Sequence, residues 1–375
     1  MGALSSLKIL DFTTLLPGPY ATLLMADLGA DVLKITAPDR VDLVTEWGPK
    51  IPGTELSGPE AWLGRNKDTI FLNLKKPKAV EAVKKLILEY DIVIEQFRPG
   101  VMAKLGLGYE ELKKVNPALI YCSLTGYGQT GPMALRAGHD INYLSRAGLM
   151  AASGRKEGGP ALYGAQVADI AAGSYGSVIG ILAAVVERDR TGKGQHIDIS
   201  MEDGVVPLNT MDAASFLAGG KLPAREEEIL NGGCHYDFYE TSDGQFMSVG
   251  SLEPKFKADL LKGLGLPETA VKDDIKAAFR LGTRSHWEEV FAKLDACVEP
   301  VQSLAEASED EHLAARGMWP EVPLEGGGTV RQMGCPVKLS ESPAEYRHAG
   351  YKTGAQTGAI LSALGYTEKD IDEMM

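Results

Sequence analysis

The sequence has few of the residues that would indicate a disulfide scaffold or a metal enzyme. Its 375 residues include only 4 Cys and 6 His. The cysteines lie far apart, and no pair of Cys or His residues has the spacing of a zinc site. We therefore expect reduced thiols, a cytoplasmic location and no bound metal ion.

Positive charge is also scarce. The chain has 38 Lys and Arg against 51 Asp and Glu, which gives a net charge of -13. Nucleic acids and acidic membrane surfaces need a dominant basic face, so we expect neither as a partner. An anionic ligand would have to meet a local cluster of basic side chains.

Leader, membrane and nucleotide signals are missing as well. No charged and then apolar leader precedes the first predicted strand. The longest apolar stretch, residues 170–186, is short for a membrane span and contains serines and small residues, which favours a buried helix. The first strand-to-helix turn, residues 13–19, lacks the three-glycine spacing that holds a dinucleotide, so a nicotinamide cofactor is not expected.

What the sequence does contain is an alternation of β-branched and amphipathic runs over residues 7–124, typical of βαβ units. The predicted strands cover residues 7–12, 31–36, 69–74, 91–96, 119–124 and 195–200, and helices are predicted from Pro77 and over 170–190 and 202–218. The fold class is therefore α/β, with a Rossmann-like parallel sheet in a large domain over residues 1–220.

A second, smaller domain is predicted after a polar, turn-rich linker at residues 221–232. A β-hairpin over 236–250 and three following helices indicate a small α+β domain over 233–330. The Gly- and Pro-rich tail, residues 331–375, is expected to return to the large domain.

Three short segments supply the residues of an acid/base site. They are His139 within residues 138–143, Asp169 within 167–173 and Glu253 within 252–256. One imidazole and one carboxylate on separate loops can remove a proton from one face of a carbon and return it to the other. Asp169 could instead cap the helix that follows, and Glu253 could simply begin one.

Several other segments are distinctive as a group. They are LDF at residues 10–12, DLGADV at 27–32, RNK at 65–67, EQFRPGV at 95–101, KLGLG at 104–108, GYGQTGP at 126–132, RTGKGQ at 190–195 and DACVEPV at 295–301. Together with the three site segments they resemble the family III CoA-transferase superfamily and, within it, the α-methylacyl-CoA racemases. The resemblance runs from about residue 4 to about residue 306.

The resemblance implies an acyl-CoA substrate and an interlocked homodimer, with each active site shared between the large domain of one subunit and the small domain of the other. Asp169 matches a carboxylate that is a nucleophile in the transferases and an acid/base in the racemases. His139 and Glu253 are typical of the racemases, where Glu253 would bind the second nitrogen of His139. The Asp169 backbone N–H would lie near the enolate oxygen, and Asp140 is expected to pair with a backbone amide.

Coenzyme A carries three phosphate groups, so basic residues must converge where it binds. The predicted CoA-binding residues are Arg40, Arg65, Lys75, Phe97, Arg98, Lys104 and Tyr143. Ala37 stands where relatives often have an Arg that stacks on the adenine, and Arg40 could replace it. Lys104 likewise stands where Arg is common. Tyr143 lines either the acyl pocket or the core.

The resulting hypothesis is a racemase that interconverts (R)- and (S)-2-methylacyl-CoA thioesters by two-base 1,1-proton transfer through an enolate. It implies a role in lipid metabolism and needs no cofactor, because coenzyme A is part of the substrate. The alternative is a family III CoA-transferase that moves CoA between carboxylic acids through an Asp169-linked intermediate. A third possibility is an acyl-CoA-binding protein without chemistry. The acyl group stays open.

Overall fold

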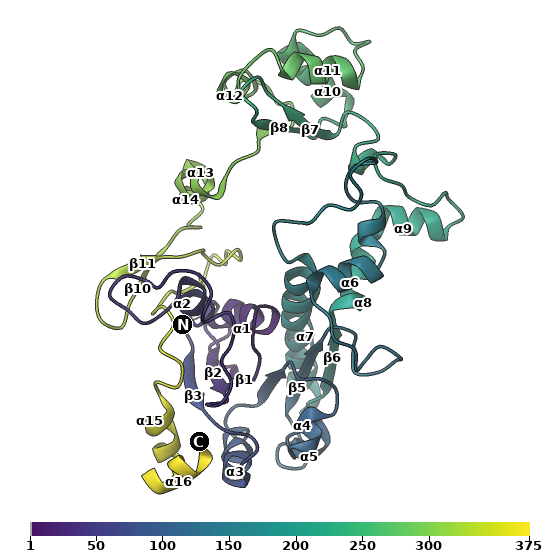
Figure 1. Cartoon of the computed structure of the whole chain (residues 1–375). Coiled ribbons are helices and arrows are strands. Elements are labelled where there is room, and N and C mark those ends of the chain that lie inside the picture. Colours follow the sequence, from purple (N-terminus) through teal and green to yellow (C-terminus); the bar gives the residue numbers. More distant parts are fainter. Residues whose placement is uncertain (1) are drawn as a thin grey trace. The chain divides into compact units, whose positions relative to one another are not determined.

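The computed structural model describes residues 2–375 and divides them into two compact units (Figure 1). Unit 1 contains the described residues through Ala147, Gly164–Leu208 and Ala314–Met375. Unit 2 contains Gly148–Tyr163 and Asn209–Leu313. Residues 148–163 and 209–232, predicted to lie in the large domain and linker, therefore belong to unit 2, and the returning tail begins at Ala314.

Unit 1 is built on a six-stranded sheet with the order β3-β2-β1-β4-β5-β6, in which every pair is parallel. The strands are β1 (Lys8–Asp11), β2 (Asp31–Thr36), β3 (Asp68–Phe71), β4 (Ile92–Glu95), β5 (Ile120–Thr125) and β6 (His196–Ser200). The predicted α/β class is confirmed. The strand order reverses between β1 and β4, and ligands bind beyond the carboxyl ends of strands at such a point.

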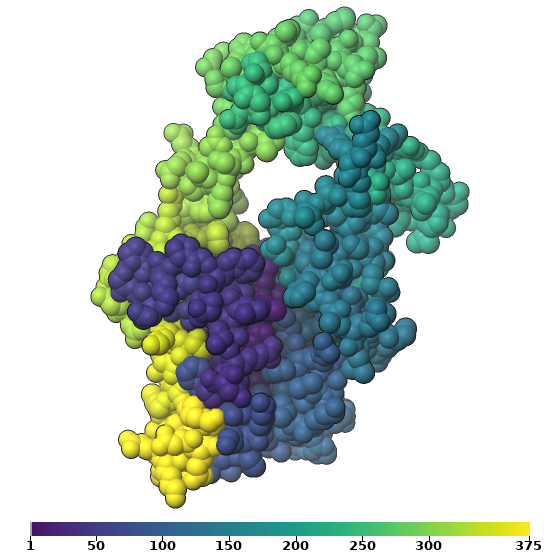
Figure 2. All heavy atoms as spheres, in the orientation of Figure 1, coloured from purple at the N-terminus to yellow at the C-terminus, as the bar shows by residue number. Residues whose placement is uncertain are grey.

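Helices cover both faces of this sheet. One face packs on α1 (Pro17–Asp27) and α7 (Tyr175–Thr191), and the other on α3 (Pro77–Leu86) with the tail helices α15 (Thr357–Ala363) and α16 (Glu368–Met374). Figure 2 shows the C-terminal segment, in yellow, against the part of unit 1 that contains α3. Shorter elements of this unit are α2 (Gly58–Leu63), α4 (Val101–Lys104), α5 (Tyr109–Leu112), α6 (Asp140–Arg146), α8 (Met201–Val205), η3 (Val206–Asn209), β10 (Glu321–Pro323) and β11 (Thr329–Arg331). The helix α14 (Glu311–Ala315) spans the point where the chain leaves unit 2 and returns to unit 1.

The helical run Ala168–Thr191 has 24 residues, and an 18-residue window within it has a mean hydropathy of 1.6. By length and composition the run is therefore long and apolar enough to cross a membrane. Its first part, η2 (Ala168–Ser174), is a π-helix that leads into α7. One side of α7 packs on the sheet through Ile181 and Ala184. On another side Ile179 and Val186 are 69% and 72% exposed. This helix therefore covers the sheet and leaves an apolar stripe uncovered within the chain.

Unit 2 contains an antiparallel sheet of β7 (Asp237–Glu240), β8 (Phe246–Val249) and β9 (Val298–Pro300). The predicted hairpin over 236–250 is confirmed by the pairing of β7 with β8. The helical elements are η1 (Leu149–Ala151), α9 (Thr210–Leu217), η4 (Ile229–Asn231), α10 (Pro254–Leu264), α11 (Lys272–Phe279), α12 (Arg284–Phe291) and α13 (Leu304–Glu309). The helix predicted over 202–218 is broken into α8, η3 and α9 around Pro207, which has no N–H to donate.

Candidate active site

Asp169 lies in the π-helix η2, within a tightly packed part of unit 1. A Cβ added at Gly204 would lie 2.5 Å from that of Ala172, and Ser174 Oγ donates to the Pro17 carbonyl at 2.7 Å. Single π-helical turns are rare and occur mostly at functional sites. The cap position of this helix is Val167, so the alternative that Asp169 is merely a helix cap is wrong.

The environment of Asp169 raises the pKa of its carboxyl group to about 7. Burial, which disfavours the charged form, is the larger cause, and the nearby charge of Asp140 adds to it. The neutral and ionised forms are therefore both populated near neutral pH. A carboxyl group in this state can act as an acid or as a base.

His139 caps the N-terminus of α6, and its own side chain is exposed. Its backbone N–H donates to Asn142 Oδ1 at 3.0 Å. Beneath it the Tyr143 hydroxyl donates to the Gly138 carbonyl at 2.6 Å, and a Cβ added at Gly138 would overlap the Tyr143 ring. Tyr143 is 5% exposed. Of its two predicted roles, the structure shows the core one: Tyr143 supports the loop that presents His139, and its contact with CoA is not supported.

Asp140 joins the His139 segment to the Asp169 segment. Its Oδ1 accepts the Asp169 backbone N–H at 3.0 Å, which confirms the expected pairing with an amide. His139 and Asp169 therefore lie on two elements linked by this hydrogen bond. The same bond occupies the N–H that was predicted to face the enolate oxygen. In this structure that amide donates to Asp140 instead.

Glu253 lies in unit 2, at the cap position of α10 and immediately before Pro254. Its side chain is exposed and makes no capping hydrogen bond. His139 and Asp169 belong to unit 1. The predicted hydrogen bond between Glu253 and His139 stays a prediction.

Arg65 occupies a position that does not fit the predicted contact with CoA. It is 1% exposed, and its guanidinium forms two hydrogen bonds with the Asp27 carboxylate, at 2.9 and 2.6 Å. A third nitrogen donates to Gln332 Oε1 at 3.0 Å and to the Met333 carbonyl at 2.8 Å. Because the guanidinium is buried and acceptors within the chain take four of its five N–H donors, Arg65 fixes the returning tail and is not available to a phosphate.

The other predicted basic residues are exposed and lie near the carboxyl ends of strands. They are Arg40, Lys75, Arg98 and Lys104. Arg40 lines a cavity of about 280 Å³ with Phe71 and Lys352, and Lys75 pairs with Asp39 at 3.2 Å. Lys352 is a candidate that the sequence did not reveal, since it lies in the tail far from Arg40. The predicted return of the tail to the large domain was the one sequence signal that could have indicated Lys352.

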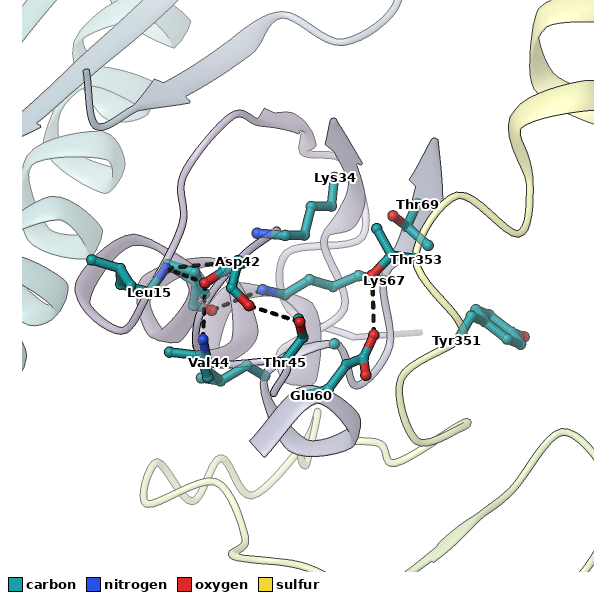
Figure 3. Close-up of a pocket in the computed structure, with 13 residues that line it drawn as sticks. Leu15, Lys34, Asp42, Val44, Thr45, Glu60, Lys67, Thr69, Tyr351 and Thr353 are labelled. Carbon is teal, nitrogen blue, oxygen red and sulfur yellow. Dashed lines mark hydrogen bonds between the residues drawn. The ribbon is translucent and has the colours of Figure 1, made fainter. Parts of the chain in front are cut away.

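A smaller cavity of about 40 Å³ lies beside the turn between β1 and α1 (Figure 3). Leu15 has a left-handed backbone, with φ at 62°, and its N–H donates to both oxygens of Asp42 at 3.1 Å. Lys67 is buried, its Nζ donates to the Pro19 carbonyl at 2.8 Å, and burial lowers its pKa to about 7. The space holds no more than a few water molecules. These residues therefore fix the turn that follows the carboxyl end of β1.

Comparisons with known proteins agree with this architecture. A family model described as CoA-transferase family III matches residues 4–357. The human alpha-methylacyl-CoA racemase is 36% identical over 99% of this chain and 96% of its own length. A mouse succinyl-CoA:glutarate CoA-transferase is 34% identical over 100% of this chain and 89% of its own. A crystal structure of a CAIB/BAIF family protein from Brucella suis, 30% identical, superposes with a TM-score of 0.85 over 97% of this chain and 99% of that one. Racemases and transferases thus resemble the chain to a similar degree.

Proposed function

Because the chain belongs to CoA-transferase family III, we propose that it acts on acyl-CoA thioesters and interconverts the (R)- and (S)-forms of 2-methylacyl-CoA in cytoplasmic lipid metabolism. One observation carries the choice of reaction. The hydrogen bond between Asp140 and the Asp169 amide links the segment of His139 to a carboxyl group whose pKa is about 7. An imidazole and a partly ionised carboxyl group on two linked elements suit proton transfer in both directions.

The proposed reaction moves one proton off the α-carbon and another onto it. The α C–H bond is acidic because the charge left behind spreads onto the thioester oxygen as an enolate. His139 takes the proton from one face and becomes an imidazolium, and neutral Asp169 gives its proton to the opposite face and becomes a carboxylate. In the reverse direction the roles exchange. Glu253 of a second subunit would accept the remaining N–H of the imidazole and fix its orientation.

Incubation of a single stereoisomer of 2-methylacyl-CoA in D₂O tests this reaction. We expect deuterium at the α-carbon and loss of optical purity, without any added acceptor acid, because the proton that returns comes from an enzyme group in exchange with solvent. Mass spectrometry measures the label, and chiral chromatography of the released acid measures the configuration. The same incubation with added free acids is the control.

The transferase activity is the alternative, supported by relatives such as the succinyl-CoA:glutarate CoA-transferase and an acetyl-CoA:oxalate CoA-transferase of Acetobacter aceti, 33% identical. In that reaction ionised Asp169 would attack the thioester carbonyl and expel CoA as a thiolate, which leaves a mixed anhydride on Asp169. The thiolate would attack the aspartyl carbonyl of this anhydride, releasing the first acid as a carboxylate and leaving CoA on Asp169 as a thioester. The acceptor carboxylate would then displace the thiolate to form a second anhydride, and attack of the thiolate on its acyl carbonyl would give the new acyl-CoA and free Asp169. If CoA passes to the added acids while the α-carbon gains no deuterium, the transferase activity replaces the racemase proposal.

We also propose that the protein is a homodimer whose second copy covers the apolar stripe on α7. The exposed residues Tyr175, Ile179 and Val186 lie on this helix at spacings that bring them to one side. Monomers rarely leave such a patch in water. We expect light scattering to give twice the mass of the chain. Ile179→Asp should shift the population towards monomer, and Glu187→Gln, a polar change on the same helix, should not. A monomeric wild type contradicts the proposal.

A further inference from the structure

Glu95 is a buried carboxylate of unit 1 that takes no part in the proposed reaction. Glu95 is the last residue of β4 and is 4% exposed. The sheet register pairs Glu95 with Ser123 of β5 and Tyr121 with His196 of β6. Because side chains two residues apart on a strand point to the same face, these four side chains share one face of the sheet.

Hydrogen bonds connect three of them in a chain that ends at the next loop. The Ser123 hydroxyl bonds to Glu95, and Ser123 Oγ lies 2.9 Å from His196 Nε2. Glu95 Oε2 accepts the Phe97 backbone N–H at 2.8 Å. A serine hydroxyl has one proton, so if Ser123 donates it to Glu95, His196 must donate to Ser123. Glu95 thus fixes the first residues of the loop that follows β4.

No cation neutralises this carboxylate within the part of the chain that the structure describes. Ion pairs within 4.0 Å do not include Glu95. Burial raises its pKa to about 7, and the hydrogen bonds from Ser123 and Phe97 oppose the rise only partly. A cavity of about 260 Å³ adjoins it, and the titratable or charged groups around that cavity are Arg98, Tyr109, Glu110, Glu111, Tyr121 and His196. Cys122 lies on the opposite face of the sheet. Burial lowers the pKa of His196, and the charge of Asp198 opposes this lowering.

We propose that Glu95 is a positioning residue that makes CoA binding depend on pH by holding the segment of residues 96–104, a loop that leads into α4. This inference rests on the proposed function and on the predicted contacts of Phe97, Arg98 and Lys104, all in this segment, with CoA. An ionised carboxylate accepts a backbone N–H about twice as strongly as a neutral group does. The loop is therefore held most firmly, and CoA binds most tightly, when Glu95 is ionised. By linkage, bound CoA favours the ionised form of Glu95.

Calorimetric titration of the full chain with CoA at pH 6 and pH 8 tests the proposal. We expect the Kd of the wild type to fall as the pH rises. Glu95→Gln keeps a carbonyl acceptor for the Phe97 N–H but cannot ionise, so its Kd should depend less on pH. Between pH 6 and pH 8 the Kd of the wild type should fall about fivefold more than the Kd of Glu95→Gln. Comparing the two proteins cancels the ionisation of the CoA phosphates. Glu110→Gln removes an exposed carboxylate beside the same cavity and should behave like the wild type.

Steady-state kinetics separates positioning from catalysis. For α-proton exchange, Glu95→Gln should change KM and its pH profile and leave kcat unchanged, because Glu95 does not touch the reacting carbon. Ser123→Ala is the second variant. It removes a donor that favours the ionised carboxylate, so the pH midpoint of CoA binding should move upward.

Parallel pH profiles of Kd in the wild type and Glu95→Gln overturn this inference and leave the proposed function intact. A wild-type Kd that rises with pH also overturns it. Failure of the wild type to bind CoA at any pH overturns the proposed function together with the inference.

Discussion

Replacing Asp169 by Asn should lower kcat for racemisation by about 10²–10⁴-fold, the usual contribution of a positioned acid or base. Asn has nearly the size of Asp, but it cannot give or take the proton. The Kd for CoA should stay unchanged, because the proposed reaction places this carboxyl group at the reacting carbon and not at the phosphates. Chiral chromatography measures the rate, and calorimetry measures the Kd.

Asp169→Asn and His139→Gln should each retain exchange of the α-proton for one stereoisomer only. Asp169→Asn retains His139 and should still exchange the α-proton of one stereoisomer with D₂O, without inverting it. His139→Gln retains Asp169 and should exchange the α-proton of the other stereoisomer only. In a transferase, Asp169→Asn would abolish the transfer of CoA, and His139→Gln would leave it nearly intact. That result would contradict the assignment of two opposed bases.

The pH dependence of kcat/KM gives an independent measure of the same pair. In each direction one of the two groups, His139 or Asp169, must carry a proton and the other must not. Both directions should therefore show the same bell-shaped profile. Activity falls at low pH because both groups are protonated, and at high pH because neither is. The limb that belongs to Asp169 should lie near pH 7. Asp140→Asn keeps an acceptor for the Asp169 N–H and removes a charge that raises the pKa of Asp169, so that limb should move to lower pH.

The strands of unit 1 could be predicted from the sequence because parallel strands are buried on both faces. Such strands are continuous apolar runs bounded by turns. The predicted strand at residues 31–36 coincides with β2, and the one at 69–74 overlaps β3 at Asp68–Phe71. The boundary between the units could not be predicted, because residues 148–163 join unit 2 through contacts with distant segments. One example is the ion pair of Arg155 with Asp237.

Within the candidate site, the acid/base residues could be predicted from the sequence, but the contacts around them could not. His139 and Asp169 were identified as acid/base candidates from their motifs. The π-helical turn at Asp169 depends on packing against Gly204 and Pro17, which no local pattern encodes. Arg65 was misassigned for a related reason. A basic residue expected in a loop on the carboxyl side of the sheet looks like a phosphate ligand. The contacts with Asp27 and with Gln332, 267 residues away, show that it is structural.

Removing the Arg65 guanidinium should produce the largest loss of stability. Arg65→Met keeps much of the apolar stem but leaves Asp27 buried without its partner. Loss of one member of a buried pair costs about 3–5 kcal/mol. Asp27 also accepts a hydrogen bond from Asn66 at 2.9 Å, and Asn66 donates to the Glu345 carbonyl in the tail at 2.7 Å. Because Asn66 is held by Asp27, loss of the partner of Asp27 weakens this support of the tail as well. Urea unfolding followed by circular dichroism measures the free energy.

Arg40→Met is the matched control, because it removes the same charge from an exposed position that lines the 280 Å³ cavity. Its free energy of unfolding should change by less than about 0.5 kcal/mol, as is usual for surface substitutions. The two variants should differ in their effect on CoA binding. Arg40→Met should raise the Kd, and Arg65→Met, measured at a temperature where it is folded, should leave it unchanged. If Arg65→Met is stable and binds CoA weakly, the guanidinium contacts the ligand after all, and the ion pair with Asp27 must open when CoA binds.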